Sequence, residues 1–366
     1  MTPSPTVANK MASTRISVVM SVYNGQEYLP EAVDSILTQT FRDFEFIIID
    51  DGSVDKTAEI LTRYAERDSR IRIISHENKG RAASLNIGIE AAKSEYIARM
   101  DADDVALPER LQQQFDFLET QPQVGIVGGA VELIKRNGSG VRRVQPPVSD
   151  SEIRTIMLQG NPMWHPAITM RRKVVIAAGG YRKQFLDADD YDLWLRMVEL
   201  CQIANLGIYV LRYRIHANQV SVQNMRHQTM CVFAARIAAA LRRSGKPDPL
   251  SEVMRITPSI TQALGVNASE IDRKVADACV YWLQLFKDAD ETAALEMVEE
   301  LLKLSRSAER TALCDACLTA AQIHYRHGRP GLALACAARA ISFRPIVAGR
   351  PVKKAFTRLA AAISKS

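Results

Sequence analysis

Three acidic residues follow a short apolar segment in the sequence Met100-Asp101-Ala102-Asp103-Asp104. A strand that ends in carboxylates can hold Mg²⁺ or Mn²⁺, because these hard cations prefer oxygen ligands and usually bind one or two carboxylates together with the phosphates of a substrate. Asp is also common in solvated turns, where its side chain bonds to the local backbone. Taken alone, the cluster predicts either a divalent-metal site for a polyphosphate or a simple turn.

The segments around this cluster predict an α/β fold. Patterns of buried strands alternate with helical spacing of apolar residues, and such alternation is typical of a mostly parallel sheet with helices on both faces. The predicted strands are residues 16–22, 44–49, 71–74 and 96–100, and the predicted helices are residues 27–39, 56–67 and 81–93.

Polar residues follow three of these strands, at residues 21–25, 50–53 and 101–103. Ligands of open α/β sheets bind at the carboxyl ends of the strands, where the strand order reverses, so we expect these residues to meet at one edge. A dinucleotide-binding dehydrogenase would carry Gly-x-Gly-x-x-Gly after the first strand, and a P-loop protein would carry Gly-Lys-Ser/Thr. The sequence contains neither motif in those places.

Length and composition indicate a globular protein of 366 residues, with 47% hydrophobic and 24% charged residues and room for two domains. No apolar run is long enough to cross a membrane, and the N-terminus lacks the apolar core of a signal peptide, so we predict a cytoplasmic location. The scattered cysteines fit a reducing compartment. Cys314 and Cys317 have the spacing of a metal or redox pair, but without a second pair nearby core packing is favoured over zinc.

The net charge of +6 is concentrated at the C-terminal end. Residues 344–366 contain six basic residues and no acidic ones, which equals the whole net charge, so the rest of the chain gives no indication of a nucleic-acid partner. This basic tail could bind an anionic membrane surface peripherally, and a solvated basic helix is an equally good interpretation.

We predict four regions along the chain. Residues 1–14 form a disordered leader, and the α/β domain covers residues 15–220. Residues 221–343 form a helical C-terminal domain, with helices at 222–243, 270–287, 291–305, 308–327 and 330–342. Part of this region is faintly similar to tetratricopeptide helix pairs, without a firm repeat period. The basic tail, residues 344–366, completes the chain.

Five motifs in this order resemble those of family 2 glycosyltransferases with a GT-A fold. They are residues 17–24 (SVVMSVYN), 39–53 (QTFRDFEFIIIDDGS), 78–89 (NKGRAASLNIGI), 96–104 (YIARMDADD) and 189–196 (DDYDLWLR). The similarity covers residues 15–220 and leaves out the C-terminal third. It implies a GT-A nucleotide-diphospho-sugar transferase domain in that region.

The resemblance implies a nucleotide site at the strand ends. Asp51 matches the position that accepts a hydrogen bond from the base, usually the imide of uracil. A carboxylate suits an imide because it only accepts, although a guanine base remains possible. Ser21 and Tyr23 would line the same nucleoside pocket. If Asp50 and Asp51 are considered alone, a simple turn with Gly52 is the alternative.

The acidic cluster has a matching role in the family. Asp101 and Ala102 would approach the ribose, Asp103 would bind Mn²⁺ or Mg²⁺, and Asp104 would support it. The bond to be broken joins a sugar to a nucleoside diphosphate, and a divalent ion would neutralise the charge that develops on the leaving phosphate.

Other residues of the matched region have weaker assignments. Arg81 or Lys79 could add positive charge near the diphosphate, and simple surface exposure is the alternative for both. His216 lies in the closing segment of the family, where it could contact metal or phosphate. A structural histidine is at least as good an interpretation for His216 and for His165. Trp194 is expected in the core.

The resemblance names Asp190 as the base that removes the proton of the acceptor hydroxyl. Asp189 replaces the Glu that is common in the family and remains a second candidate. Helix N-terminal charge would also explain Asp187, Asp189 and Asp192. One carboxylate base without a nucleophile implies direct displacement with inversion.

We therefore predict a metal-dependent, inverting glycosyltransferase that uses a nucleotide-sugar donor, with a UDP-sugar favoured. The acceptor would be a hydroxyl of a glycan or lipid-linked molecule in surface-polysaccharide assembly. A sugar nucleotidyltransferase is the enzymatic alternative, but its Gly- and basic-rich triphosphate loop is missing from the sequence. A nucleotide-binding scaffold that recruits a partner through its helical region is the non-catalytic alternative.

Overall fold

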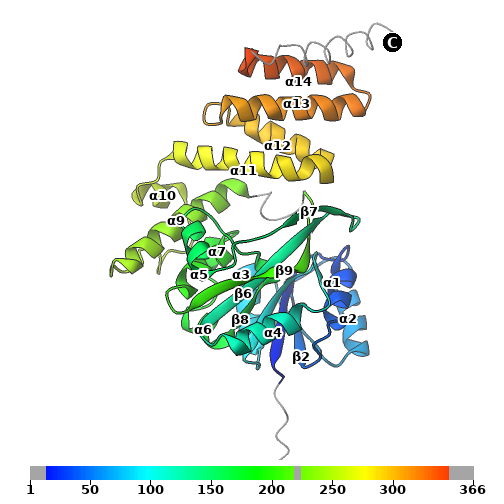
Figure 1. Cartoon of the computed structure of the whole chain (residues 1–366), viewed down its shortest axis with the longest axis vertical. Coiled ribbons are helices and arrows are strands. Elements are labelled where there is room, and N and C mark those ends of the chain that lie inside the picture. The colour runs from blue at the N-terminus through cyan, green and yellow to red at the C-terminus, as the bar shows by residue number, and fades with distance from the viewer. Residues whose placement is uncertain (1–13, 218–223, 346–366) are drawn as a thin grey trace, which may run out of the picture. The chain divides into compact units, whose positions relative to one another are not determined.

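The computed structural model describes residues 14–217 and 224–345 (Figure 1). Most of the predicted leader and basic tail lies outside these residues. The chain forms two compact units. The first contains the residues up to Val131, Val144–Lys183 and Leu193–Arg212, and the second contains Glu132–Arg143, Gln184–Asp192 and the residues from Tyr213 onward. The boundary predicted near residue 220 stays a prediction.

The first unit opens with the alternating strands and helices that the sequence predicts. The elements are β1 (Ile16–Val22), α1 (Leu29–Leu37), β2 (Phe44–Asp50), α2 (Thr57–Arg67), β3 (Ile71–Ser75), α3 (Arg81–Ala91) and β4 (Tyr96–Asp101). β1 pairs in parallel with β2 and β4, and β2 pairs in parallel with β3. The predicted parallel sheet is therefore present in this part of the chain.

The following elements complete the sheet in a different way. They are β5 (Val105–Ala106), α4 (Arg110–Thr120), β6 (Val124–Ile134), β7 (Gly140–Val144), α5 (Asp150–Met157), the 3₁₀ turn η1 (His165–Ala167), β8 (Thr169–Arg171), α6 (Arg172–Ala177), the 3₁₀ turn η2 (Lys183–Phe185), α7 (Asp189–Met197) and β9 (Gln202–Arg214).

The nine strands of the described residues form one mixed sheet in the order β3-β2-β1-β4-β8-β6-β9-β5, with β7 paired to β6. β8 is antiparallel to β4 and β6, and β5 is antiparallel to β9. The expectation of a mostly parallel sheet thus holds only for β1 to β4. Parallel neighbouring strands need a crossover connection, usually a helix. The strands that are joined by such helices and paired in parallel are β1 to β4.

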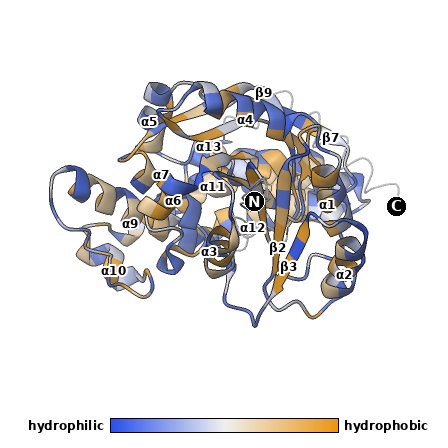
Figure 2. Ribbon diagram, turned by 90° about the horizontal axis from the view of Figure 1, so that it is seen from below, coloured by the Kyte–Doolittle hydropathy of each residue, from blue (hydrophilic) through white to orange (hydrophobic). Residues whose placement is uncertain are grey.

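The core of the first unit forms where helices cover these buried strands. β2 is largely hydrophobic (Figure 2), and Phe46 to Ile49 are fully buried. α3 packs closely on β1 and β2 because it has a glycine at the contact. A Cβ atom on Gly88 would lie 2.5 Å from Val19 Cγ1 and 2.8 Å from Ile49 Cδ1.

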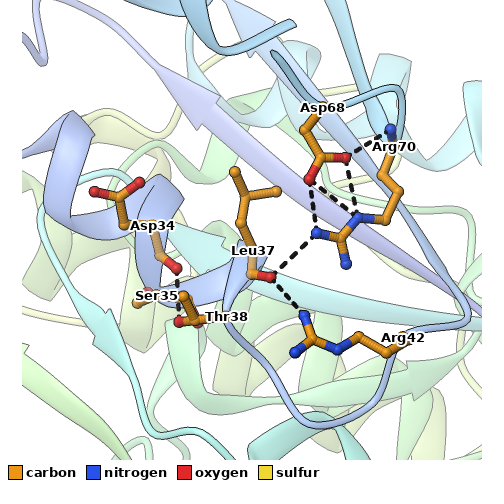
Figure 3. Close-up of polar contacts among 7 residues, drawn as sticks. All are labelled: Asp34, Ser35, Leu37, Thr38, Arg42, Asp68 and Arg70. Carbon is orange, nitrogen blue, oxygen red and sulfur yellow. Dashed lines mark hydrogen bonds and ion pairs between the residues drawn. The ribbon is translucent and has the colours of Figure 1, made fainter.

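The end of α1 is capped by cations from other parts of the chain (Figure 3). The Leu37 carbonyl accepts hydrogen bonds from Arg42 Nη1 and Arg70 Nη2, both at 3.1 Å. Asp68 holds Arg70 in place through an ion pair of 2.7 Å. Since the last turn of α1 has no basic residue of its own, these arginines supply the charge that complements the helix dipole.

The second unit is mostly helical. Its helices after residue 224 are α9 (Met225–Arg243), α10 (Pro258–Ala263), α11 (Ala268–Ala289), α12 (Glu291–Lys303), α13 (Arg310–Arg326) and α14 (Pro330–Phe343). All except the short α10 were predicted from the sequence. Cys314 and Cys317 are buried in α13 and pack with Ala340, as expected for core residues. None of the described helices combines the length and apolar character that a membrane crossing requires.

Candidate active site

Three loops meet at the carboxyl edge of the parallel strands. In the strand register, Ser21 of β1 lies opposite Ile49 of β2 on one side and opposite Asp101 of β4 on the other, and Val22 lies opposite Asp50. β1 is the point where the strand order reverses, because β2 and β3 lie on one side of it and β4 on the other. The predicted convergence of polar residues at one edge is therefore confirmed.

Asn24 ties the first two of these loops together. Its Oδ1 accepts a hydrogen bond from the Val54 backbone N–H at 2.9 Å, and its own N–H donates to Ser53 Oγ at 2.9 Å. The Asn24 backbone has a φ of 50°, a left-handed conformation that Asn tolerates better than most residues. The sequence signal for this role of Asn24 is the Asn-Gly pair, which is typical of tight turns.

Asp51 is buried and joins the second loop to the start of α3. Its Oδ1 accepts from the Lys79 N–H at 2.8 Å and its Oδ2 from the Gly80 N–H at 3.0 Å. Gly80 precedes the first turn of α3, where the helix dipole favours a negative charge. Each carboxylate oxygen keeps a second lone pair beyond these bonds, and His76 Nδ1 lies 3.5 Å from Oδ1. The adjacent Gly52 adopts a left-handed φ of 78°, so the predicted turn is present as well.

The acidic cluster brings three carboxylates together. Oxygen atoms of Asp101, Asp103 and Asp104 all lie within 4.8 Å of one another. Asp104 is buried, and the other two are partly buried, so the cluster is not a fully solvated turn. Three converging oxygen ligands with an accessible side suit Mg²⁺ or Mn²⁺, which keep open positions for phosphate oxygens. The residues present therefore fit the predicted metal.

Two buried arginines lie behind this cluster. Arg99 and Arg110 are each 1% exposed. Arg99 donates a short hydrogen bond to the Asp101 carboxylate, and Arg110 Nη2 donates to the Arg99 carbonyl at 2.6 Å. Burial lowers the pKa of Arg110 to about 9, against the opposing effect of Asp104, so Arg110 stays charged at neutral pH. These guanidinium groups offset part of the carboxylate charge.

The remaining residues of the predicted donor site have different exposures. Ser21 and Ala102 are partly buried, whereas the Tyr23 side chain is 52% exposed. Arg81 is partly buried as the first residue of α3, and Lys79 is exposed just before it. Their roles in nucleotide binding stay predictions.

His165 and Trp194 are both part of the packed interior. The His165 Nε2 lies 2.8 Å from the Tyr181 hydroxyl. Burial, with Arg99 and Arg81 as weaker causes, holds the pKa of His165 well below its ordinary value, so the ring is neutral. This environment favours the structural interpretation of His165. Trp194 is fully buried, and its predicted place in the core is confirmed.

The other predicted site residues lie in the second unit. Asp189 and Asp190 are in the first turn of α7, where negative charge is favourable. Asp189 is 1% exposed, whereas Asp190 is only partly buried and its Oδ1 accepts from the Tyr191 N–H at 2.7 Å. His216 is buried just after β9. Their assignments as base and metal ligand stay predictions.

Comparisons with known proteins show to which family the chain belongs. The family model for glycosyl transferase family 2 matches residues 17–179. The O-antigen biosynthesis glycosyltransferase WbnJ of Escherichia coli is 37% identical over 205 residues, which cover 55% of this chain and 80% of WbnJ. The chain belongs to glycosyl transferase family 2. The amylovoran biosynthesis glycosyltransferase AmsE of Erwinia amylovora is also similar to this glycosyltransferase, with 32% identity over 56% of the chain and 78% of AmsE.

Solved structures share the fold of this glycosyltransferase. S. aureus TarS 1-349 in complex with UDP-GlcNAc matches with a TM-score of 0.51 at 14% identity, over 88% of this chain and 90% of TarS 1-349. The mannosyltransferase PcManGT from Pyrobaculum calidifontis, in complex with GDP-Man and Mn²⁺, matches with a TM-score of 0.50 at 17% identity, over 90% and 88% of the two chains. The predicted GT-A fold is confirmed, and the glycosyltransferase is an enzyme.

Proposed function

We propose that this glycosyltransferase transfers a sugar from a UDP-sugar to a hydroxyl of a glycan or lipid-linked acceptor in cell-surface polysaccharide biosynthesis. The names of WbnJ and AmsE, which refer to O-antigen and amylovoran biosynthesis, support this setting. The observation that carries the proposal is the group of three carboxylates within 4.8 Å, at the strand edge that also holds Asp51.

On the donor side, Asp51 would accept a hydrogen bond from the imide of uracil. Its carboxylate is held in place by the Lys79 and Gly80 amides, so little reorganisation accompanies binding. Ser21 and Tyr23 would contact the nucleoside, and Arg81 would add positive charge toward the diphosphate.

Asp103 would hold Mn²⁺ or Mg²⁺, with Asp104 in support, while Asp101 and Ala102 would face the ribose. When bound, the ion supplies Lewis-acid stabilisation of the leaving diphosphate. Arg99 and Arg110 limit the repulsion among the carboxylates. His216 would be a further contact to metal or phosphate.

Asp190 is the proposed base for the acceptor hydroxyl. The acceptor hydroxyl must come close to the base that removes its proton. Asp190 is partly accessible, whereas Asp189 is almost completely buried. Asp189 is therefore the second choice. One base without a nucleophile implies inversion at the anomeric carbon. We further propose a cytoplasmic enzyme whose basic tail contacts an anionic membrane.

The decisive experiment is calorimetric titration of UDP and GDP into the full chain, each with and without MnCl₂. We expect Mn²⁺-dependent UDP binding that is lost in Asp103→Asn and kept in Asp116→Asn, a matched change of an exposed acid on α4. A panel of UDP-, GDP- and dTDP-sugars, read by release of the nucleoside diphosphate, then identifies the donor. Absence of nucleotide binding under all conditions would overturn the donor-site proposal.

A further inference from the structure

The loop just before α7 holds a strained residue. Asp187 has a left-handed backbone with a φ of 71° and is 4% exposed. This conformation is disfavoured for a residue with a Cβ, and it persists only where the surroundings fix it. Asp187 lies two residues before the start of α7 and three before Asp190, so the conformation of Asp187 sets how the chain enters the helix turn that carries Asp190.

Helix α9 fixes this residue from within the same unit. Gln228 Nε2 donates a hydrogen bond of 2.7 Å to the Asp187 carbonyl. One residue earlier on the helix, His227 Nδ1 lies 3.8 Å from Asp187 Oδ2. The first contact holds the backbone of Asp187, and the second places the His227 ring beside its carboxylate, beyond hydrogen-bond distance.

The His227 ring also contacts the chain beyond α9. His227 Nε2 lies 3.2 Å from the Ile256 carbonyl, which lies beyond the end of α9. The segment before Asp187 is also tied to this region, because Gln184 Nε2 donates to the Leu250 carbonyl at 3.2 Å. The loop is therefore held at two points by the chain from Met225 to Ile256.

We propose that Gln228 is a positioning residue for catalysis, which acts by fixing Asp187 and thereby the orientation of Asp190. This inference rests on the proposed role of Asp190 as the base. It gives the first helix of the C-terminal region a part in the reaction. A misplacement of about 1 Å at a catalytic group costs on the order of 100-fold in rate, so a hydrogen bond to the loop is enough to matter.

The test uses the full chain and the donor of the panel that it turns over. Gln228→Glu keeps the size of the side chain but removes the N–H donor. We expect kcat to fall by roughly 10- to 100-fold, with the KM of the donor and the affinity for UDP within about twofold of wild type. Gln262→Glu, the same change at an exposed position of α10, is the matched control and should leave kcat unchanged.

A double-mutant cycle separates positioning from general loss of structure. If Gln228 acts through Asp190, Gln228→Glu should change kcat by less than about twofold in an Asp190→Asn background. Full additivity, or an unchanged kcat in the single variant, overturns the inference. If Asp190→Asn alone keeps full activity, the proposed base is wrong, which is a separate result.

Hydrogen exchange gives a readout that needs no substrate. Faster exchange in residues 185–191 of Gln228→Glu, with residues 44–53 unchanged, supports local positioning. Unchanged exchange in residues 185–191 overturns it. If Gln228→Glu fails to fold, Gln228→Asn tests the same bond without adding a charge, since the shorter amide cannot span the distance.

Discussion

Single residues of the first unit differ in how their environment sets their charge, and His165 is the clearest case. Its folded pKa lies well below that of the unfolded chain because of burial. The unfolded state therefore binds a proton that the folded state does not, and stability falls as pH drops below about 6.5. Above that pH the contribution is fully present.

We predict that this linkage disappears in His165→Gln, whose side chain cannot titrate. Between pH 7.5 and 5.5, wild type should lose about 1.4 kcal/mol more unfolding free energy than the variant, the value for one proton over one pH unit. Urea unfolding at both pH values measures the difference. Parallel losses in the two proteins would show that His165 is protonated in the folded state.

Substitution of Asp51 gives a direct test of the proposed donor site. Asp51→Asn keeps the shape of the side chain but replaces a charged acceptor at the start of α3. Charge-assisted hydrogen bonds contribute about 1.5–3 kcal/mol, so we expect UDP to bind roughly 10- to 100-fold more weakly in MnCl₂. The control is Asp43→Asn, an exposed acid before β2. Equal affinities in calorimetry would remove Asp51 from the nucleotide site.

At the scale of elements, the close packing of α3 on β1 and β2 reverses the effect on stability that helix propensity predicts for a Gly-to-Ala substitution. Ala is favoured over Gly in a helix by about 1 kcal/mol. At Gly88, however, a methyl group would lie 2.5 Å from Val19 Cγ1, and overpacking costs about 1–3 kcal/mol. We therefore expect Gly88→Ala to lower the unfolding free energy.

The helical position Gly331 in α14 is the control, because a Cβ atom there has no neighbour within 4 Å among the described residues. Gly331→Ala should stabilise the protein by about 0.4–1 kcal/mol. Urea unfolding of both variants compares the two effects. Stabilisation by both substitutions would mean that α3 can move away from the sheet at little cost.

The elements also show what the sequence can and cannot predict. β1 to β4 and the long helices follow from periodic patterns of apolar residues, and the meeting of Ser21, Asp50 and Asp101 follows from parallel pairing. β5 and β8, with two and three residues, are too short for a pattern. The sequence does not predict the role of Arg99, because a buried guanidinium depends on carbonyl and carboxylate partners that only the folded chain brings together.

At the scale of the whole molecule, the chain passes back and forth between the two units. Gln184–Asp192 belongs to the second unit although the chain returns to the first unit afterwards. A chain that ends at residue 220 would lack Gln228 and Leu250, which hold this segment. The region that resembles the family is therefore not structurally independent of the helices that follow it.

We predict that the shortened chain 1–220 keeps Mn²⁺-dependent UDP binding but loses sugar transfer by at least about 10-fold, since Asp190 is no longer held. Calorimetry and the release assay measure the two properties. The control chain 1–345 lacks only residues outside the described structure and should keep both. Full transfer by residues 1–220 would contradict a role for the helical region.

The early position of Gln184–Asp192 in the sequence matters during synthesis of the chain on the ribosome. Gln184 finds its partner Leu250 only 66 residues later. At about 5–20 residues per second, roughly 3 to 13 s pass between the synthesis of these two residues. The strand edge with Asp51 and Asp103 can form during that interval, but the loop that carries Asp190 must wait for its partners. With Asp190 as the proposed base, the order of translation would delay the onset of catalysis until the helical region has emerged.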